Sequence, residues 1–590
     1  MEEELRNFID SKFQVPVVEG ENKVCSLEEA IKRNVREGMV VHLASQCSAL
    51  HYQLVREFWG KKPGFTIVCQ SISGPLLALV LGRLMKKAVV SFAGNGYPSP
   101  SPNLLVQKAY DSGEIEFENW TMRTVSQRLL AGAMGWGFIP TKSLLGSSME
   151  AENKESFIVM EDPFNQSEKI GLMRALRPDI TLIHGVAADR CGNTIMTYPL
   201  GIDAFGAWGA KNGVIVSVEK IVSTEYIRRC SHLVRIPSYM VRAVCEVPYG
   251  AHPAGVTHHG LPEFEAYCDD YDFMAQVTEA AKDEKKFSRW VEDWVLSCED
   301  HNDYLSKLGK DRLLYLKGKA DPNAWVAETM SEIRRVDFKK QPNSLERMVV
   351  AGSRIIAEKC ISEGYKTILA GIGLPNLSAW LAVYALKERG YMVDLMAEIG
   401  VYGFLPRPSE PFVFSYLNLP TCKILTNIDT TLGLFVGGSE NRCMGVLGAA
   451  QADKFGNVNS TKIPGQAYLV GSGGANDVAS TNKDTVVVVN SGKQRLVEEV
   501  PYITFPGKNV RTLVTDVGIF EKIGGRETFT LTAYSPSETG HGEEEAIAAI
   551  KERVGWKLEF ALDLKEVQPP TKEEITMLRL FDPKGYFIKK

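Results

Sequence analysis

The chain has 590 residues, of which 44% are hydrophobic and 24% charged, values near those of ordinary soluble globular proteins. This composition excludes a disordered or fibrous protein, and the length requires at least two hydrophobic cores. The 67 Lys and Arg residues nearly balance the 72 Asp and Glu residues, which leaves a net charge of −5. Because nucleic-acid binders usually carry a basic excess or stripe, no nucleic-acid partner is expected.

The N-terminal sequence M-E-E-E is acidic and lacks the charged-then-apolar order of a signal peptide. The most apolar stretch, 368–386, contains Pro375 and two glycines, which predicts a strand, a turn and a helix rather than a membrane span. The eleven cysteines include no C-x-x-C pair, which fits neither a disulfide framework nor a zinc ribbon. We therefore expect a cytoplasmic protein with reduced thiols and no membrane partner.

Two segments of the chain start alike. Ser26 opens a helical pattern that leads to a strand-like run at 39–41, and Ser344 opens another that leads to 367–369. The motif A-D-[RK]-x-G-N then occurs at 188–193 and again at 452–457, with the turn chemistry of Asp, Gly and Asn. The pattern indicates a duplication. The interval between the two markers is longer in the first copy, so an insertion is expected there, as a lid or an interface.

Short apolar β-branched runs such as 213–218 and 485–490 alternate with helical segments such as 352–363. This alternation predicts an α/β protein made of two related open domains with mainly parallel sheets covered on both faces. The segment 283–340 is rich in charge, with Trp290, Trp294 and Leu305 spaced as on an amphipathic helix, so the first domain is expected to carry extra helical insertions. We place the domain boundary near 340, giving domains 1–340 and 341–590.

Several catalytic motifs are missing from the sequence. There is no G-x-S-x-G elbow, no H-E-x-x-H and no G-x-x-x-x-G-K-[ST] loop. Neither 94–96 nor 371–373 completes a dinucleotide fingerprint. The pair His258-His259 has no carboxylate or cysteine cluster at ligand spacing beside it. We expect neither a metal nor a permanently bound cofactor.

Glu398 is the strongest candidate for a catalytic residue. It follows the apolar run 393–397, and glycines at 400 and 403 and a proline at 406 come after it. A strand ending at Ala397 would hold this carboxylate at the mouth of a sheet, while Gly400 and Gly403 allow a tight turn and close approach of a ligand. Such a carboxylate can act as a nucleophile. Its alternatives are Glu440, within S-E-N, and the pair Glu116 and Glu118 in the first domain.

The order of E-x-G-x-x-G-x-x-P, A-D-[RK]-x-G-N and G-S-G-G-A-N-D resembles the class I coenzyme A transferases of the glutaconate and 3-oxoacid type. The resemblance covers nearly the whole chain, including the segments 128–133, 247–253 and 555–571, and implies that the family's two subunits are fused here. It implies that Glu398 is the nucleophile, forming an acyl-glutamyl anhydride and then a glutamyl-CoA thioester in ping-pong fashion. An acyl-CoA and a small carboxylic acid are the expected substrates, and a homodimer or higher homo-oligomer is the default assembly.

The glycine-rich segment 471–477 is the best candidate for binding coenzyme A. Glycines let its N–H groups converge on phosphate or carbonyl oxygens, so we expect contacts from the residues Gly471, Gly473, Gly474, Ala475 and Asn476. In the first domain, family members commonly carry a glycine-rich turn after the first strand, whereas this chain has H-L-A-S-Q-C at 42–47. The N–H of Ala44 or Ser45 is then the expected oxyanion donor.

This altered turn leaves a second interpretation open, in which the same scaffold hydrolyses or decarboxylates a CoA thioester. The presence of Glu398 favours transfer over decarboxylation, because covalent chemistry needs that residue. A third interpretation, a non-catalytic sensor of acyl-CoA, would need a defective nucleophile, and the sequence shows none.

Overall fold

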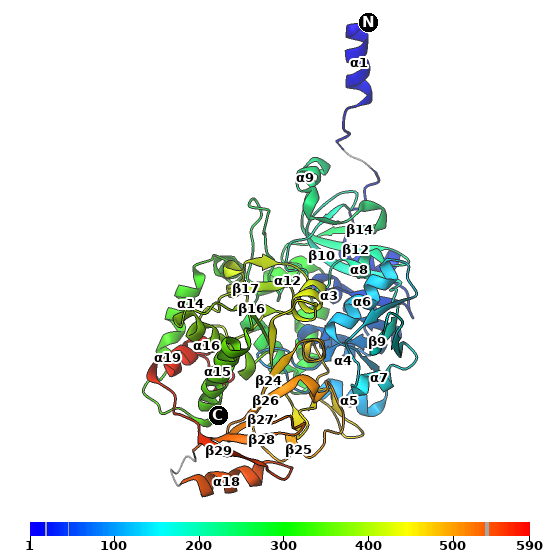
Figure 1. The fold of residues 1–590 in the computed structure, drawn as a ribbon. Coiled ribbons are helices and arrows are strands. Elements are labelled where there is room, and N and C mark those ends of the chain that lie inside the picture. Colours follow the sequence, from blue (N-terminus) through cyan, green and yellow to red (C-terminus); the bar gives the residue numbers. More distant parts are fainter. Residues whose placement is uncertain (18–19, 45, 537–541, 590) are drawn as a thin grey trace.

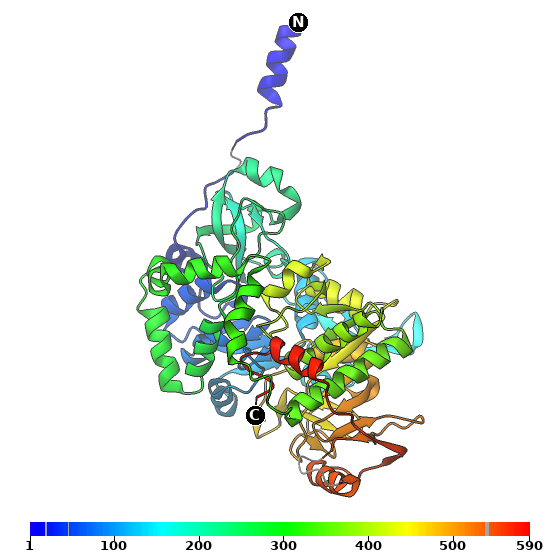
Figure 2. The same ribbon diagram turned by 90° about the vertical axis from the view of Figure 1, so that its left-hand side faces the viewer.

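The structure is a computed structural model that describes residues 1–590 except 18–19, 45, 537–541 and 590. Two large β-sheets accompanied by helices form its centre, one built from the first part of the chain and one from the last (Figure 1). Helix α1 (Glu2–Lys12) buries no side chain and stands away from the rest of the molecule in both ribbon views (Figures 1 and 2). Within the described residues, no helix is both long and apolar enough to span a membrane.

The first sheet has the strand order β13-β11-β10-β1-β2-β4-β6, with β12 and β14 following beside β10. Its neighbours β1, β2, β4, β6, β10, β12 and β14 pair in parallel. The strands are β1 (Val40–Leu43), β2 (Phe65–Val68), β4 (Met85–Val90), β6 (Glu116–Asn119), β10 (Ile180–Asp189), β11 (Thr194–Ile195), β12 (Val214–Val222), β13 (Val234–Ile236) and β14 (Val241–Glu246). Helices that accompany this sheet are α2 (Leu27–Asn34), α3 (Ser48–Phe58), α4 (Leu77–Leu81), α5 (Leu104–Ser112) and α6 (Met122–Ala133).

The second sheet has the order β18-β17-β16-β15-β19-β24-β26-β27-β28-β29, and its central strands β16, β15, β19, β24 and β26 are parallel. The strands are β15 (Thr367–Ala370), β16 (Asp394–Ala397), β17 (Val401–Phe404), β18 (Ile424–Leu425), β19 (Cys443–Leu447), β24 (Asp484–Val488), β26 (Val510–Val514), β27 (Gly518–Glu521), β28 (Thr530–Tyr534) and β29 (Phe560–Glu566). Helices α15 (Ser344–Glu363), α16 (Leu374–Glu388), α17 (Ala475–Thr481), α18 (Gly542–Arg553) and α19 (Lys572–Phe581) belong to this part. The predicted fold class, two related α/β units with mainly parallel sheets, is confirmed.

The two copies of A-D-[RK]-x-G-N form the same turn. The Asp189 carboxylate accepts N–H bonds from Gly192 and Asn193, and its second oxygen accepts the Asn193 amide at 2.8 Å. Asp453 does the same with the Asn457 backbone at 2.9 Å and the Asn457 amide at 3.0 Å. In both places the aspartate replaces backbone partners that a tight turn cannot supply, so its role is structural.

The insertion in the first half is an antiparallel sheet with the order β7-β9-β8, formed by β7 (Phe138–Thr141), β8 (Phe157–Asp162) and β9 (Asn165–Arg174). The loop and short helix α7 (Ser148–Glu152) between β7 and β8 contact the second half. Ser148 exchanges two hydrogen bonds of 2.8 Å with Ile503, and the Tyr502 hydroxyl donates to Glu152. Of the two expected roles for an insertion, these contacts favour an interface.

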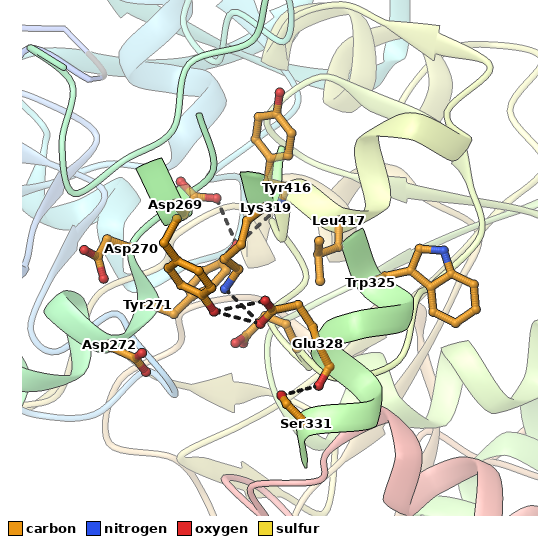
Figure 3. Close-up of polar contacts among 12 residues, drawn as sticks. Asp269, Asp270, Tyr271, Asp272, Lys319, Trp325, Glu328, Ser331, Tyr416 and Leu417 are labelled. Atoms are coloured by element: carbon orange, nitrogen blue, oxygen red, sulfur yellow. Dashed lines mark hydrogen bonds and ion pairs between the residues drawn. The ribbon is translucent and has the colours of Figure 1, made fainter. Parts of the chain in front are cut away.

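Extra helices follow the first sheet, as predicted: α10 (Tyr271–Ala280), α11 (Glu284–Val291), α12 (His301–Leu308), α13 (Lys310–Lys319) and α14 (Ala324–Glu332). Trp290, Trp294 and Leu305 all pack on one core, but they belong to separate helices because Asp300 caps a new helix by accepting two backbone N–H bonds. Figure 3 shows this region against the second half, where the Tyr271 hydroxyl donates to Asp269 and accepts the Tyr416 N–H at 3.2 Å.

The two halves also share an apolar core. One cluster of buried side chains joins Trp120, Val125 and Leu129 of the first half to Met396 and Leu432 of the second. Burying such a surface stabilises the pairing of the halves at about 25 cal/mol per Å² of apolar area. The chain crosses from one half to the other through residues 336–343, and the Asn343 side chain caps α15 there.

Candidate active site

Glu398 is the first residue of the turn between β16 and β17. Strand β16 ends at Ala397, and its Leu395, Met396 and Ala397 side chains are buried, so the carboxylate emerges from a well-packed strand. The turn is tight because Gly400 has φ +113°, and a Cβ there would lie 2.2 Å from the Thr426 carbonyl oxygen. The sequence pattern therefore located the strand end and the glycine that the turn requires.

The first half holds this turn in place. Gly201 N–H donates to the Ile399 carbonyl, Leu200 N–H donates to the Thr426 carbonyl, and Ile428 N–H donates to the Gly201 carbonyl, all at 2.9–3.0 Å. These bonds join residues that are distant in the chain. No sequence motif marked the 200–201 segment, and its role became visible only in the folded chain.

The glycine-rich segment 471–477 lies directly against Glu398. A Cβ on Gly474 would be 1.9 Å from Glu398 Oε2, so only a glycine leaves room for the carboxylate in this position. Gly471 has φ +111° and pairs with Phe92 of the first half, and Gly473 N–H donates to the Ser91 carbonyl at 2.9 Å. The segment is thus clamped between the halves.

Asn476 and Asp477 fix the helix that follows. The Asn476 side chain accepts the Leu144 N–H and donates to the Thr504 carbonyl, both at 2.9 Å. Asp477 is fully buried and accepts hydrogen bonds from the Thr121 and Ser143 hydroxyls of the first half. The side chain of Asn476, a residue predicted to contact coenzyme A, is therefore hydrogen-bonded to protein partners.

A cleft of about 1230 Å³ runs between the halves. Both Glu398 and the residues Gly471–Ala475 line it, together with Gln70 and Ser71 of the first half. Among the described residues that line this cleft, Glu398 is the sole Asp or Glu, and Arg495 is the sole Lys or Arg. Strands β16 and β24 of the second half, labelled in Figure 1, each lead at the carboxyl end into residues that line the cleft.

The environment of Glu398 makes its carboxyl group unusual. Burial raises its pKa to about 8, and the negative charge of Asp477 adds to this rise. In the described part of the chain its carboxylate takes part in no hydrogen bond or ion pair, so its oxygens are available to a ligand. A half-buried carboxylate with a raised pKa in a cleft is typical of a functional group.

The other predicted residues lie in different surroundings. Gly403, with φ +73°, sits within β17, and a Cβ there would meet the Lys423 side chain. Ala44 lines a smaller cavity beside the cleft, but its N–H already donates to the Leu182 carbonyl at 3.0 Å. Ser45 lies outside the described residues. The Gly400 N–H donates to the Ala397 carbonyl.

The alternative carboxylates do not line the cleft. Glu118 forms ion pairs with Arg128 at 2.9 Å and Lys87 at 2.6 Å, and Glu116 pairs with Lys87 at the surface. Glu440 is exposed. The described residues also contain no group of three His, Cys, Asp or Glu side chains arranged to hold a metal ion.

Sequence comparison finds coenzyme A transferases as relatives of both halves of the chain. A family model described as Coenzyme A transferase matches residues 24–247. One subunit of the glutaconate CoA-transferase from Acidaminococcus fermentans is 29% identical over 317 residues, which are 50% of this chain and 95% of the relative. One subunit of the 3-oxoadipate CoA-transferase from Pseudomonas knackmussii is 31% identical over 263 residues, which are 40% of this chain and 92% of the relative.

A solved structure has the same fold along the whole chain. An acyl-CoA transferase from Escherichia coli, in a thioester complex with CoA, aligns over 96% of this chain and 98% of its own with a TM-score of 0.62 and 16% identity. The separate subunits of the bacterial relatives thus correspond to one continuous polypeptide here. The chain belongs to the coenzyme A transferase family, as an enzyme in which counterparts of the two subunits are fused.

Proposed function

We propose that this enzyme moves coenzyme A from an acyl thioester to a carboxylic acid through covalent intermediates on Glu398. The observation that carries the proposal is that, among the described residues lining the cleft, Glu398 is the sole carboxylate and its oxygens have no protein partner. Its position beside Gly474, in a glycine-rich segment held by both halves, supports the same role.

The reaction proceeds in two symmetrical parts. An oxygen of ionised Glu398 attacks the thioester carbonyl carbon; the C–S bond breaks, leaving an acyl-glutamyl anhydride and CoA thiolate. The thiolate then attacks Cδ of Glu398, the anhydride C–O bond breaks, and the first carboxylate leaves. A second carboxylate attacks this glutamyl thioester and displaces the thiolate, which attacks the new acyl carbonyl and regenerates Glu398.

Each attack creates an oxyanion that needs a donor. The expected donor Ala44 directs its N–H to the Leu182 carbonyl, and the N–H of the turn residue Gly400 donates to the Ala397 carbonyl. The Gly474 N–H donates to no protein acceptor among the described residues, and the residue itself lies against the Glu398 carboxylate. We assign Gly474 N–H as an oxyanion donor, an interaction typically worth about 3 kcal/mol in the transition state.

The cleft also suits coenzyme A itself. A volume of about 1230 Å³ exceeds the usual range for drug-sized ligands, roughly 300–1,000 Å³, and so matches a larger molecule. Arg495, exposed at the cleft, is the residue we assign to the CoA phosphates, since a guanidinium binds phosphate in bidentate fashion. Gly471–Ala475 contribute backbone groups along the path to Glu398.

Two relatives are named for glutaconate and 3-oxoadipate, which are dicarboxylic acids. Names of this kind support transfer, and the alternative of a hydrolase or decarboxylase gains no support from them. A cytoplasmic location and a homo-oligomeric assembly stay predictions from the sequence.

The test is to trap the covalent intermediate. The full chain is incubated with acetyl-CoA, reduced with borohydride and digested for mass spectrometry. A reduced adduct at Glu398 is the expected result. Consumption of the thioester without an adduct at that residue, together with release of free acid, would indicate hydrolysis and overturn the proposal.

A further inference from the structure

A second, smaller cavity adjoins the cleft beside the candidate nucleophile. Its volume is about 110 Å³, against about 1230 Å³ for the cleft. Gln70 and Ile399 line both spaces, and Ile399 is the residue next to Glu398. We call this cavity the side chamber. A group bound at Glu398 therefore has two directions in which to extend.

The two spaces differ in what they can hold. A cavity needs roughly 10–15 Å³ for one water molecule, so the side chamber has room for several waters or for a short acyl chain. It has no room for the nucleotide part of coenzyme A. Size alone assigns the cleft to coenzyme A and the side chamber to the acyl group.

The chamber wall has more apolar than polar surface, its polar side chains being those of Gln46, Gln70, His184 and Thr197. Apart from Ile399, it is built by the first half: by residues 183–186 in the middle of β10, by the segment 196–202 that follows β11, and by Ala44, Gln46, Gln70 and Val256. Its apolar side chains include Ile183, Val186, Met196, Leu200, Ile202 and Val256. Such a wall favours an apolar group, at roughly 0.8 kcal/mol per buried CH₂.

No ionised partner for a ligand carboxylate is available in the chamber. Among the described residues that line it there is no Lys, Arg, Asp or Glu. The one titratable side chain is that of His184, and both ring nitrogens are already paired, with the Ser217 hydroxyl at 2.9 Å and Glu219 at 2.8 Å. A second carboxylate placed here would meet no opposite charge, only the neutral amides of Gln46 and Gln70 and the Thr197 hydroxyl, which is unfavourable.

We infer that the acyl group carried by this enzyme is a short, uncharged aliphatic one, derived from a monocarboxylic acid and held in the side chamber. A dicarboxylic acyl group, with its distal carboxylate in the chamber, is disfavoured by the missing counter-charge. This inference rests on the proposed function, because it takes Glu398 as the point at which the acyl carbonyl reacts.

The test compares two donors that differ by one carboxylate. Butyryl-CoA and glutaryl-CoA are offered to the full chain with labelled acetate as acceptor, and kcat/KM is measured for each. We expect butyryl-CoA to be preferred by roughly a hundredfold or more, since discrimination against an unpaired buried charge is of that order. A kcat/KM for glutaryl-CoA equal to or above that for butyryl-CoA overturns the inference.

Two variants locate the preference in the chamber. Met196→Trp reduces the space, and we expect it to lower kcat/KM for butyryl-CoA about tenfold while acetyl-CoA loses less than about threefold. Met196→Lys supplies an ammonium group and should raise the glutaryl-to-butyryl ratio about tenfold, whereas the neutral control Met196→Gln should not. Equal losses for butyryl- and acetyl-CoA, or an unchanged ratio in a folded Met196→Lys, place the acyl group elsewhere and overturn the inference.

Failure of the proposed function gives a different result. If no acyl-CoA exchanges with acetate and no adduct forms at Glu398, the proposed function and this inference fall together. If exchange and the adduct are present but glutaryl-CoA is the better donor, the inference alone is wrong.

Discussion

The two halves present corresponding strand ends to the same cleft, but with different side chains. In the first half β1 is flanked by the parallel strands β2 and β10, and in the second β15 is flanked by β16 and β19. Gln70 lies just beyond the end of β2, and Glu398 just beyond the end of β16; both line the cleft. One half thus offers a neutral amide where the other offers a carboxylate.

The same halves keep their aspartate turns alike. Asp189 and Asp453 bind equivalent backbone and asparagine donors in equivalent turns. A duplicated fold therefore retains the groups that satisfy its backbone and diverges at the strand ends that face a ligand. The charge of Asp477 already adds to the raised pKa of Glu398, so a further carboxylate at the opposite strand end would raise that pKa still more.

Removing the carboxylate should produce the largest effect. Glu398→Gln keeps the size of the side chain and deletes its nucleophilic oxygen, so we expect exchange between acyl-CoA and acetate to fall at least about 10⁴-fold. The measurement is kcat for isotope exchange. Glu440→Gln, at an exposed site, is the matched control and should retain wild-type activity. Wild-type exchange in Glu398→Gln would contradict the nucleophile assignment.

Gly474→Ala should come next. Its Cβ would meet Glu398 Oε2, which is the mobile end of a side chain, so the carboxylate must move while the fold changes little. We expect kcat to fall about a hundredfold with little change in the midpoint of thermal unfolding. The control is Gly318→Ala, where a Cβ has no atom within 4 Å. A variant with full activity would show that the geometry beside Glu398 is unimportant.

Making the two strand ends alike should have a smaller effect. Gln70→Glu places a second carboxylate in the cleft, which should raise the pKa of Glu398 above its value of about 8. In the wild type kcat/KM should rise with pH as Glu398 ionises, and in Gln70→Glu that rise should move upward by about one pH unit. At pH 7 this corresponds to about a tenfold loss. Gln70→Asn is the neutral control, and an unshifted profile would place the two side chains out of contact.

The same ionisation has a modest effect on stability. Because burial raises the Glu398 pKa from 4.5 to about 8, the folded chain holds this proton more tightly than the unfolded chain. The associated stabilisation is complete below about pH 4.5 and is lost as the pH rises through about 8. Glu398→Gln should therefore become more stable than the wild type by about 1–3 kcal/mol at about pH 9, and not at pH 5. Denaturant unfolding at both pH values measures this difference, and equal differences would contradict the raised pKa.

Local patterns predicted much of this molecule. Helix α2 begins after its cap Ser26, and β16 ends at Ala397, shortly before a glycine. Both signals act over a few residues, so the sequence alone is enough to predict them. The repeated A-D-[RK]-x-G-N revealed the duplication for the same reason. In α15 the cap is Asn343, one residue before the predicted start.

Long-range packing could not be predicted from the sequence. The contact between Gly474 and Glu398, and the bonds from Leu200 and Gly201 to the active-site turn, join segments far apart in the chain. The longer first interval indicated an insertion but not its antiparallel sheet, and the Trp290 and Leu305 pattern did not show the helix break at Asp300. Asp477 stood within the glycine-rich motif, yet its partners Thr121 and Ser143 could be identified only in the folded chain.

The partners of Asp477 bear on how the enzyme assembles. The buried Asp477 carboxylate takes its hydroxyl donors from the first half and would lose them if the halves separated. Exposing it to water would also require opening the apolar core that the halves share. The shared apolar core then holds the two halves together. The exposed connection at 339–341 ensures that both halves are made in equal amounts. A protease cut in that connection would leave a nicked, still assembled enzyme.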